Sequence, residues 1–294
     1  MPNPAPRLNI GLPVYNGADY IEQTLISLQK QTFTDYKLII SDNASTDRTE
    51  EICREYAARD ERICYYRNEK NIGATQNWYR VFDLSSSEYF ASVAHDDIYD
   101  PDYMRKCIDV LDSRPDVILC YSRTDAIDGK GDFMGKVEIT VDTMSPKPHK
   151  RLYNVIAIDY LCIQLYGVMR SSALKSTKVF QGYYGCDRNT LAELTLLGAL
   201  YEIPEFLFHH RLYENALGIA MGSGKSVDEL NILDPGTDWR YRDTFKTIYT
   251  TYYKSVSRLI DSPVDRFLCY QALTSLVLQK AVKRIGRSLL GKKS

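Results

Sequence analysis

The sequence of 294 residues lacks the marks of a membrane-spanning, secreted or nucleic-acid-binding protein. It has no run approaching the roughly 18 apolar residues that a helix needs to cross a membrane. Residues 1–4 show no basic-then-apolar signal segment. The formal net charge is −1, so the chain lacks the global positive field on which many nucleic-acid-binding proteins rely. We therefore expect a cytoplasmic protein with no nucleic-acid partner.

The cysteines are also few and irregularly placed. Their number is odd and no two form a C-x-x-C pair, which argues against both a disulfide framework and a zinc site. Most of them sit in apolar runs, as reduced thiols in the core of a cytoplasmic protein do. The seven are Cys53, Cys64, Cys107, Cys120, Cys162, Cys186 and Cys269.

The composition and the alternating strand and helix patterns favour a packed α/β domain. Hydrophobic residues make up 44% of the chain and charged residues 26%, so a sizeable core is expected and disorder is not. Strand and helix patterns alternate through the first 125 residues, which predicts a mostly parallel sheet flanked by helices. The expected strands are 8–14, 36–41, 62–66, 88–93 and 117–121; the expected helices are 19–31, 74–84, one opened by a capping-box-like Asp47 and Glu50, and one starting at Asp100-Pro101.

The middle and end of the chain are less regular. Residues 129–148 carry glycine, proline and charge, which predicts a hairpin or a mobile loop. Patterns typical of a strand, a helix and a second strand follow at 163–170, 187–198 and 206–212. The final segment predicts two helices, 240–260 and 264–290.

Polar clusters follow three of the expected strands. They are Tyr15-Asn16, Asp42-Asn43 and His95-Asp96-Asp97. Ligands of parallel α/β sheets bind beyond the carboxyl ends of the strands, so we expect these clusters to converge on one ligand site.

Asp96 and Asp97 are two adjacent carboxylates at the end of a buried strand. Such a pair is costly unless a cation compensates it. Mn²⁺ and Mg²⁺ take one or two protein carboxylates together with phosphate oxygens and water, so the pair indicates a divalent cation that bridges a diphosphate. The alternative is a solvated turn before the helix at Pro101.

Two further turns are candidates for ligand contacts. Asp42 can accept a hydrogen bond from a base or ribose, by analogy with dinucleotide folds, or it can cap the following helix. Asn71 and Gly73 form a turn that leaves room for a close backbone approach.

These motifs together resemble the family-2 inverting glycosyltransferases with the GT-A fold. The resemblance covers residues 8–125 and rests on four motifs in order and at matching spacing. Four motifs in register are much harder to obtain by chance than any one of them. They are Pro13-Val14-Tyr15-Asn16, then Ser41-Asp42-Asn43-Ala44-Ser45-Thr46-Asp47, then Asn71-Ile72-Gly73, then His95-Asp96-Asp97. The metal-binding motif of that family is often Asp-x-Asp; His95 is a variant of it.

The resemblance implies a role for each matching position. A nucleotide-sugar would be bound by Pro13, Tyr15, Asp42, Asn71 and Asp96, with Tyr15 and Asp42 at the base, Asn71 at the base or ribose, and Asp96 at the ribose or sugar. Asp97 would ligate the divalent cation, Mn²⁺ or Mg²⁺.

The resemblance also implies a catalytic base that opens a helix in the acceptor half. Asp187, in Gly185-Cys186-Asp187-Arg188, has the expected spacing from Asp97 and is followed by a helical pattern. It would take the proton of the acceptor hydroxyl. The structural alternative is an ordinary helix N-cap, and both roles can hold together. Many relatives place a histidine after the strand at 206–212; here Tyr213 occupies that position, and His210 or Tyr213 is the candidate substitute.

The expected organisation follows from these assignments. Residues 1–220 would form the GT-A domain, with a nucleotide-sugar half at 1–125 and an acceptor half at 126–220. A flexible loop at 221–238 and a helical extension at 239–294 would follow. After Asp265 the chain has no acidic residue, and a basic amphipathic helix of this kind either packs on the domain with a solvated basic face or lies on an anionic membrane surface.

The sequence therefore predicts an inverting glycosyltransferase. Its partners would be a nucleotide-sugar donor and a glycan or lipid-linked acceptor of cell-surface polysaccharide or glycolipid synthesis. A sugar nucleotidyltransferase is an alternative, although residues 12–17 lack the basic residues that a triphosphate loop needs. A non-catalytic carbohydrate-binding or scaffold protein that kept the fold is another.

Overall fold

The structure is a computed structural model that describes residues 5–137, 139, 141–158, 162–178, 185–212 and 241–290. For residues 241–245, 281 and 283–290 it describes the backbone alone. The expected loop at 221–238 and Tyr213 lie outside these residues, as do the side chains of Lys283, Arg284 and Arg287 in the basic helix.

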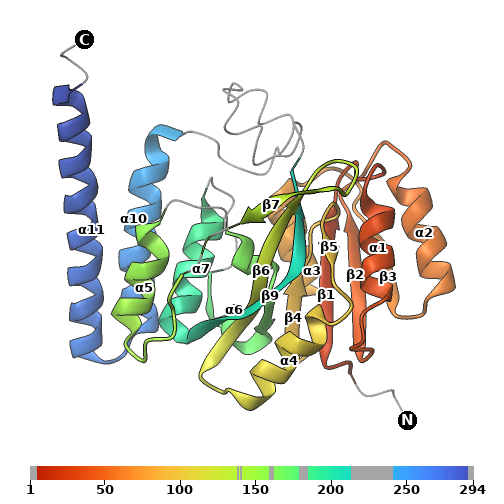
Figure 1. Ribbon diagram of the computed structural model, residues 1–294, viewed down its shortest axis with the longest axis horizontal. Coiled ribbons are helices and arrows are strands. Elements are labelled where there is room, and N and C mark those ends of the chain that lie inside the picture. The colour runs from red at the N-terminus through yellow and green to blue at the C-terminus, as the bar shows by residue number, and fades with distance from the viewer. Residues whose placement is uncertain are drawn as a thin grey trace.

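A single mixed sheet runs through the middle of the protein (Figure 1). Within the described residues it has nine strands in the order β3-β2-β1-β4-β8-β6-β9-β5, with β7 paired to β6. β1, β2, β3 and β4 are parallel, β8 is antiparallel to both of its neighbours, and β6 and β9 are parallel. The strands are β1 Leu8–Val14, β2 Tyr36–Asp42, β3 Ile63–Arg67, β4 Tyr89–Ser92, β5 Ile98–Tyr99, β6 Val117–Ile127, β7 Phe133–Val137, β8 Val168–Arg170 and β9 Ala199–Arg211.

Helices cover both faces of the sheet because successive strand residues point to opposite sides. In β4, Tyr89 and Ala91 join one core while Phe90 joins the other. The first core packs on α1 (Ile21–Gln29), α2 (Thr49–Arg59) and α4 (Tyr103–Ser113). The second packs on α3 (Ala74–Asp83), α5 (Pro148–Ala157), α6 (Ser171–Ser176), α7 (Cys186–Leu197), α10 (Tyr241–Leu259) and α11 (Pro263–Leu290).

The predicted fold class is confirmed, with local corrections. The strand expected at 163–170 is a 3₁₀ turn, η1 (Ile163–Tyr166), followed by β8. Pro101 lies before α4, not at its first position. The capping box is wrong, because Asp47 accepts from the backbone N–H of Thr49 and Glu50 pairs with Arg54. The segment 129–148 does form a hairpin strand, β7, against β6.

The parallel register brings the first polar clusters together. Val14 at the end of β1 lies beside Asp42 at the end of β2, and Asp42 lies beside Arg67 at the end of β3. The loops that leave these strands therefore begin side by side at one edge of the sheet.

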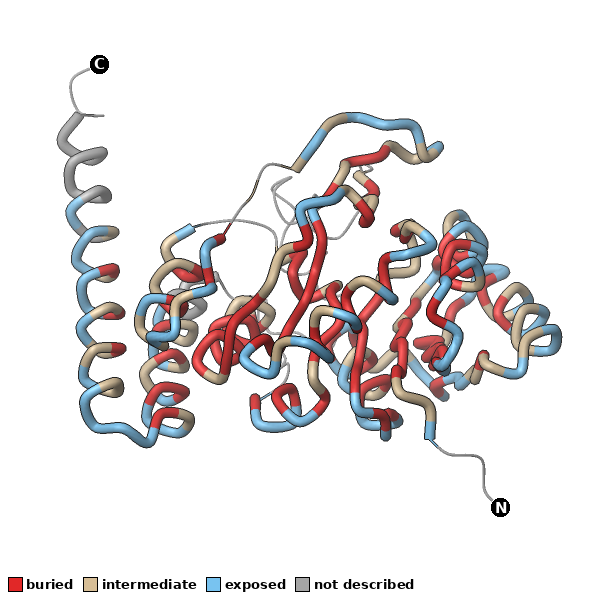
Figure 2. The backbone as a smooth tube through the Cα atoms, turned by 60° about the horizontal axis from the view of Figure 1, so that its bottom comes forward, coloured by how far each residue is buried: buried red, intermediate tan, exposed pale blue. Residues whose placement is uncertain are grey.

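The C-terminal helices form an outer layer on the second face. α11 is the outermost helix in Figure 1, and Figure 2 shows that its buried residues lie on the side toward the rest of the protein. Cys269, Leu273 and Leu276 are buried on the part of it whose side chains the structure describes. Among the described residues, no helix combines the length and apolar character that a membrane span requires.

Arg151 on α5 connects that helix to the end of α7. It is only 6% exposed, and its guanidinium donates to the carbonyls of Thr195, Leu196 and Ser145 at 2.8 to 3.4 Å. Two of these are carbonyls at the end of α7, where a helix leaves its last acceptors without internal partners.

Replacing Arg151 with methionine should lower the free energy of unfolding by about 3 kcal/mol, because buried carbonyls lose their donor. Urea unfolding followed by circular dichroism measures this. Lys150→Met, an exposed position on the same helix, is the control and should change stability by less than about 0.5 kcal/mol. Equal effects of the two substitutions would show that Arg151 does not act as a helix-terminal donor.

Candidate functional site

The loops after β1 and β2 are joined by hydrogen bonds between backbone and short polar side chains. Asn16 adopts a φ of 50°, its N–H donates to Ser45 Oγ at 2.9 Å, and its Oδ1 accepts from Thr46 N at 2.8 Å. The N–H groups of Gly17 and Ala18 donate to Thr49 Oγ1 and Asp47 Oδ2. Tyr15 and Pro13, both half-buried, are thus held at the edge of the sheet beside Asp42.

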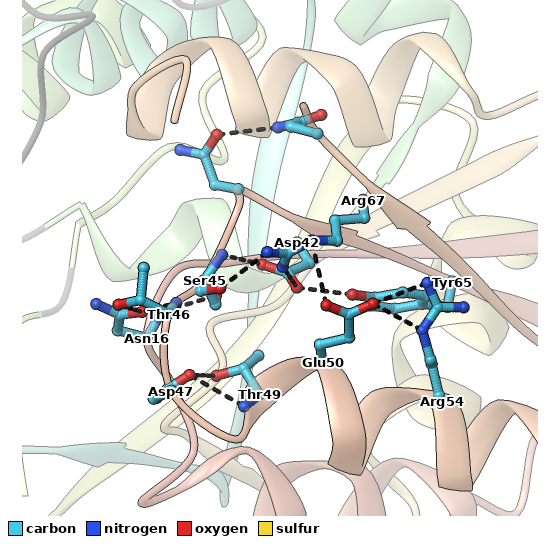
Figure 3. A network of polar contacts seen from close by, with 12 residues as sticks. Asn16, Asp42, Ser45, Thr46, Asp47, Thr49, Glu50, Arg54, Tyr65 and Arg67 are labelled. Atoms are coloured by element: carbon cyan, nitrogen blue, oxygen red, sulfur yellow. Dashed lines mark hydrogen bonds and ion pairs between the residues drawn. The ribbon is translucent and has the colours of Figure 1, made fainter. Parts of the chain in front are cut away.

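Asp42 is the centre of this part of the site, as Figure 3 shows. Its side chain is fully buried; Oδ1 accepts from Ser45 N at 2.8 Å, and Oδ2 accepts from Tyr65 Oη and Arg67 Nη1, each at 2.7 Å. Arg67 also donates to the carbonyl of Ser45 at 3.0 Å. Both oxygens of Asp42 therefore already organise the loop, and its contact with a base stays a prediction.

A ladder of asparagines holds the turn at Asn71 against the same loop. Asn43 Nδ2 donates to Asn71 Oδ1 at 2.7 Å, and Asn71 Oδ1 also accepts from Gly73 N at 2.8 Å. Asn68 Nδ2 bridges Asn43 and Asn77 at 2.9 and 3.0 Å. Gly73, with φ of 89°, makes the sharp entry into α3 that a side chain would strain. The structure thus brings Asn71 beside the Asp42 loop, as the motifs predicted.

The Asp96-Asp97 pair lies between β4 and β5 and is held by β9. Asp97 is fully buried, and its Oδ1 accepts from Arg211 N at 2.9 Å and lies 3.0 Å from His210 Nδ1. Asp97 Oδ2 is buried without a hydrogen-bond partner among the described residues. Asp96 beside it is half-buried. The loop also reaches the first motif, because the side chain of His95 packs against Gly17, where an added Cβ would come within 2.5 Å of it.

The electrostatics of Asp97 fit a group that binds a cation. Burial raises the pKa of Asp97, while the hydrogen bond from His210 acts in the opposite direction without cancelling that effect. Burial alone would lower the pKa of His210, but the hydrogen bond and charge of Asp97 raise it above its ordinary value. The described protein groups therefore do not fully compensate the negative charge of the buried Asp97 carboxylate, and they leave its Oδ2 without a hydrogen bond.

The donor set also fits a cation that relies on its substrate for further ligands. No group of three or more His, Cys, Asp or Glu suited to a metal occurs within the described residues. Mn²⁺ and Mg²⁺ accept carboxylate oxygens and complete their coordination with phosphate and water. Asp97 Oδ2, with Asp96 and His210 nearby, is the atom that such an ion would take.

Arg211 is a site residue that the sequence did not reveal. It is 1% exposed, and its guanidinium donates to the carbonyls of Asp96, Asp128 and Gly129 and to Gln23 Oε1 at 2.7 to 3.1 Å. It also lies over the ring of Tyr20, 4.9 Å from the centroid. An arginine at the end of an apolar strand is the signal that could have indicated it, since a charge is seldom buried without a full set of acceptors.

Asp187 is the second residue of α7. The N-cap position belongs to Gly185, which has a φ of 85°, so the simple N-cap alternative for Asp187 is wrong. Asp187 is half-buried, and its Oδ1 accepts from Arg188 N at 2.8 Å. Burial raises the pKa of the Cys162 thiol, and the charge of Asp187 raises it further. A carboxylate in the first turn is also favoured by the helix dipole.

Tyr166 lies near the Asp96-Asp97 pair, because its ring stacks on His210, which contacts Asp97. Burial raises the pKa of Tyr166, and the charges of Asp97, Asp96 and Asp187 raise it further, so the phenol stays protonated at neutral pH. The turn that ends at Tyr166, η1 (Ile163–Tyr166), packs against α7, the helix that carries Asp187. Of the predicted site residues, the structure thus brings His210 into contact with Asp97, and one turn lies against both His210 and α7.

Known sequences resemble the chain over its first half. A model of the family described as "Glycosyl transferase family 2" matches residues 10–176. An uncharacterized glycosyltransferase of Rickettsia typhi is 33% identical over 120 residues, which is 40% of this chain and 36% of that protein. The putative teichuronic acid biosynthesis glycosyltransferase TuaG of Bacillus subtilis is 32% identical over 114 residues, 39% of this chain and 45% of TuaG. The match spans less than half the length of each of these two relatives.

Solved structures resemble the chain over most of its length. S. aureus TarS (residues 1–349) in complex with UDP-GlcNAc has a TM-score of 0.63 at 15% identity, covering 92% of this chain and 71% of that one. The mannosyltransferase PcManGT of Pyrobaculum calidifontis in complex with GDP-Man and Mn²⁺ has a TM-score of 0.52 at 14% identity, covering 98% and 81%. At such identities the likeness establishes the fold, and it confirms the predicted GT-A class.

Replacing Arg211 with methionine should lower the free energy of unfolding by about 3 kcal/mol, because several buried acceptors lose their donor at once. Urea unfolding measures the effect. The control is Arg123→Met on β6, whose side chain is 46% exposed, pairs with Glu202 at 3.4 Å and lies 6.0 Å from the centroid of the Phe206 ring. That variant should stay within about 0.5 kcal/mol of the wild type. An Arg211 variant as stable as the control would show that the hydrogen bonds of Arg211 do not stabilise the site.

Proposed function

The chain belongs to glycosyl transferase family 2, as its motifs predicted, and from this premise we propose that it moves a sugar from a nucleoside diphosphate sugar to an acceptor hydroxyl, with inversion at the anomeric carbon. The observation that carries the proposal is the buried Oδ2 of Asp97, which no described residue satisfies, beside His210. An in-line displacement needs a group for the leaving diphosphate and a base for the attacking hydroxyl on opposite sides of one sugar.

The donor is bound in this proposal at the carboxyl edge of the sheet, with Pro13, Tyr15, Asp42 and Asn71 at the nucleotide and Asp96 at the ribose or sugar. The hydrogen-bonded loops around Asp42 support it, since a site held in place before binding loses less entropy when the ligand arrives. TarS with UDP-GlcNAc and PcManGT with GDP-Man share the fold, which supports a nucleotide-sugar as the donor class.

A divalent cation, Mn²⁺ or Mg²⁺, is the proposed cofactor, held by Asp97 with His210 in contact with that carboxylate. When bound, it would neutralise charge on the leaving diphosphate. The unsatisfied Oδ2 of Asp97 and the Mn²⁺ in the PcManGT complex support this assignment.

Asp187 is the proposed base. Its carboxylate accepts the proton of the acceptor hydroxyl as the new glycosidic bond forms and the bond to the diphosphate breaks. The acceptor is a glycan or a lipid-linked glycan of cell-surface polysaccharide or glycolipid synthesis. The name of TuaG, a putative enzyme of teichuronic acid biosynthesis, supports this class of product.

Asp187→Asn should keep donor affinity within about twofold and lower transfer at least about 100-fold, because the amide cannot take a proton. Donor binding is measured by thermal shift and calorimetry with Mn²⁺ and a panel of nucleotide-sugars, and turnover by release of the nucleoside diphosphate. The matched control is Asp265→Asn, an aspartate in the first turn of α11, which should transfer normally.

Three other outcomes would contradict parts of this proposal. Near-normal transfer by Asp187→Asn would remove the base assignment. A wild type that binds nucleotide-sugars but turns none over would favour the carbohydrate-binding or scaffold alternative. Formation of a nucleotide-sugar from a nucleoside triphosphate and a sugar phosphate would favour the nucleotidyltransferase.

We also propose a peripheral membrane contact through α11, which would bring the site to a lipid-linked acceptor at the inner face of the membrane. Phe267, Leu278 and Val282 are 60 to 68% exposed on this helix, opposite its buried residues. The sequence beyond Asp265 carries basic residues and no acidic one, which would attract an anionic surface.

The double substitution Phe267→Ser with Leu278→Ser should lower co-sedimentation with phosphatidylglycerol vesicles at least about tenfold, because it removes two of the exposed apolar side chains. Gln271→Ser, exposed on the same helix, should sediment as the wild type does. Wild type that stays in solution would contradict the membrane contact. A concentration-dependent dimer that the double substitution dissociates would assign this face to a second copy instead.

A further inference from the structure

One short segment links the candidate base to the candidate metal carboxylate. Cys162 begins it, immediately before η1, and lines the same small cavity as Arg188, the residue next to Asp187. Tyr166 ends it, and its ring stacks on the ring of His210 with centroids 6.4 Å apart and an interplanar angle of 26°. His210 in turn contacts Asp97 at 3.0 Å. A single 3₁₀ turn therefore runs from one side of the reacting groups to the other.

The backbone of Tyr166 is fixed from two directions. Its carbonyl accepts from Tyr103 Oη at 3.1 Å. Gly167, the next residue, lies so close to β6 that an added Cβ would come within 2.4 Å of the carbonyl oxygen of Cys120. The chain can take this path because glycine has no side chain there, and Tyr166 is held at a set distance from the sheet.

The ring of Tyr166 is also held in place, but its hydroxyl is not. Phe208 packs on the ring with centroids 5.6 Å apart, and His210 stacks on it. Among the described residues, the hydroxyl has no hydrogen-bond partner, although a buried tyrosine usually finds one. The side chain is half-buried, so one part of it remains open to a ligand.

In the proposed reaction the diphosphate leaves toward Asp97, and the acceptor approaches from the side of Asp187. The sugar must occupy the space between them. Tyr166 stacks on His210, which contacts Asp97, and its turn η1 packs against α7, which carries Asp187.

We propose that Tyr166 is a sugar-binding residue whose hydroxyl hydrogen-bonds a hydroxyl of the transferred sugar, while its ring forms one wall of the sugar site. This inference rests on the proposed transferase function. It assigns to Tyr166 the discrimination between a nucleotide-sugar and the nucleoside diphosphate that lacks the sugar. A purely structural role would not require the hydroxyl, because the packing on Phe208 and His210 involves the ring alone.

Tyr166→Phe tests the hydroxyl while keeping the ring. Calorimetry with Mn²⁺ would compare UDP-GlcNAc and GDP-mannose with UDP and GDP for the full chain. The variant should bind the nucleoside diphosphate as the wild type does and bind the preferred nucleotide-sugar about fivefold to tenfold more weakly, the effect of one lost hydrogen bond. Tyr56→Phe is the control, since its hydroxyl contacts Glu22 at an exposed position, and it should bind both ligands normally.

The outcomes separate this inference from the function on which it rests. If the wild type binds the nucleotide-sugar and Tyr166→Phe binds it equally well, the sugar-binding role is wrong and the proposed function stands. An equal loss for the nucleoside diphosphate and the nucleotide-sugar would assign Tyr166 to the framework of the site. If the wild type binds none of these four compounds, the proposed donor is wrong and the role of Tyr166 falls with it.

Discussion

The contact of Asp97 with the end of β9 is the interaction on which the site depends. One oxygen of Asp97 accepts from the backbone of Arg211 and contacts His210, while the guanidinium of Arg211 binds the carbonyls of Asp96 and of the loop after β6. A buried arginine is stable here because its donors meet a fixed set of oxygens. Arg211 also donates to Gln23 near the start of α1. These bonds fix the end of β9 relative to both α1 and the Asp96-Asp97 pair.

A second buried carboxylate organises the nucleotide edge in the same way. Asp42 binds the backbone of Ser45, the hydroxyl of Tyr65 and the guanidinium of Arg67, so the ends of β2 and β3 and the loop after β2 form one hydrogen-bonded unit. Charge-assisted hydrogen bonds in a buried setting are strong, which suits loops that must keep their shape without a ligand. Asp42 serves the frame of the site whether or not it also touches a base.

The helix that carries Asp187 is supported from the C-terminal helices. Glu193, in the middle of α7, is 2% exposed and binds Arg258 and Ser255 of α10 and the backbone of Lys178. Gly185, just before Asp187, packs so closely on Ile248 that an added Cβ would come within 2.7 Å of it. α10 is therefore part of the structure that positions the start of α7, and so the proposed base.

The sequence by itself determined the alternating strands and helices, the fold class and the family, because hydrophobic periodicity and four spaced motifs are local properties of the chain. It also predicted that the motifs after β1, β2 and β4 would meet, since parallel strands end at one edge. Arg211, Tyr166 and the approach of Cys162 to Asp187 were decided by tertiary structure alone. These residues act through contacts with segments far away in the chain, and no local pattern records which buried acceptor or ring will lie beside them.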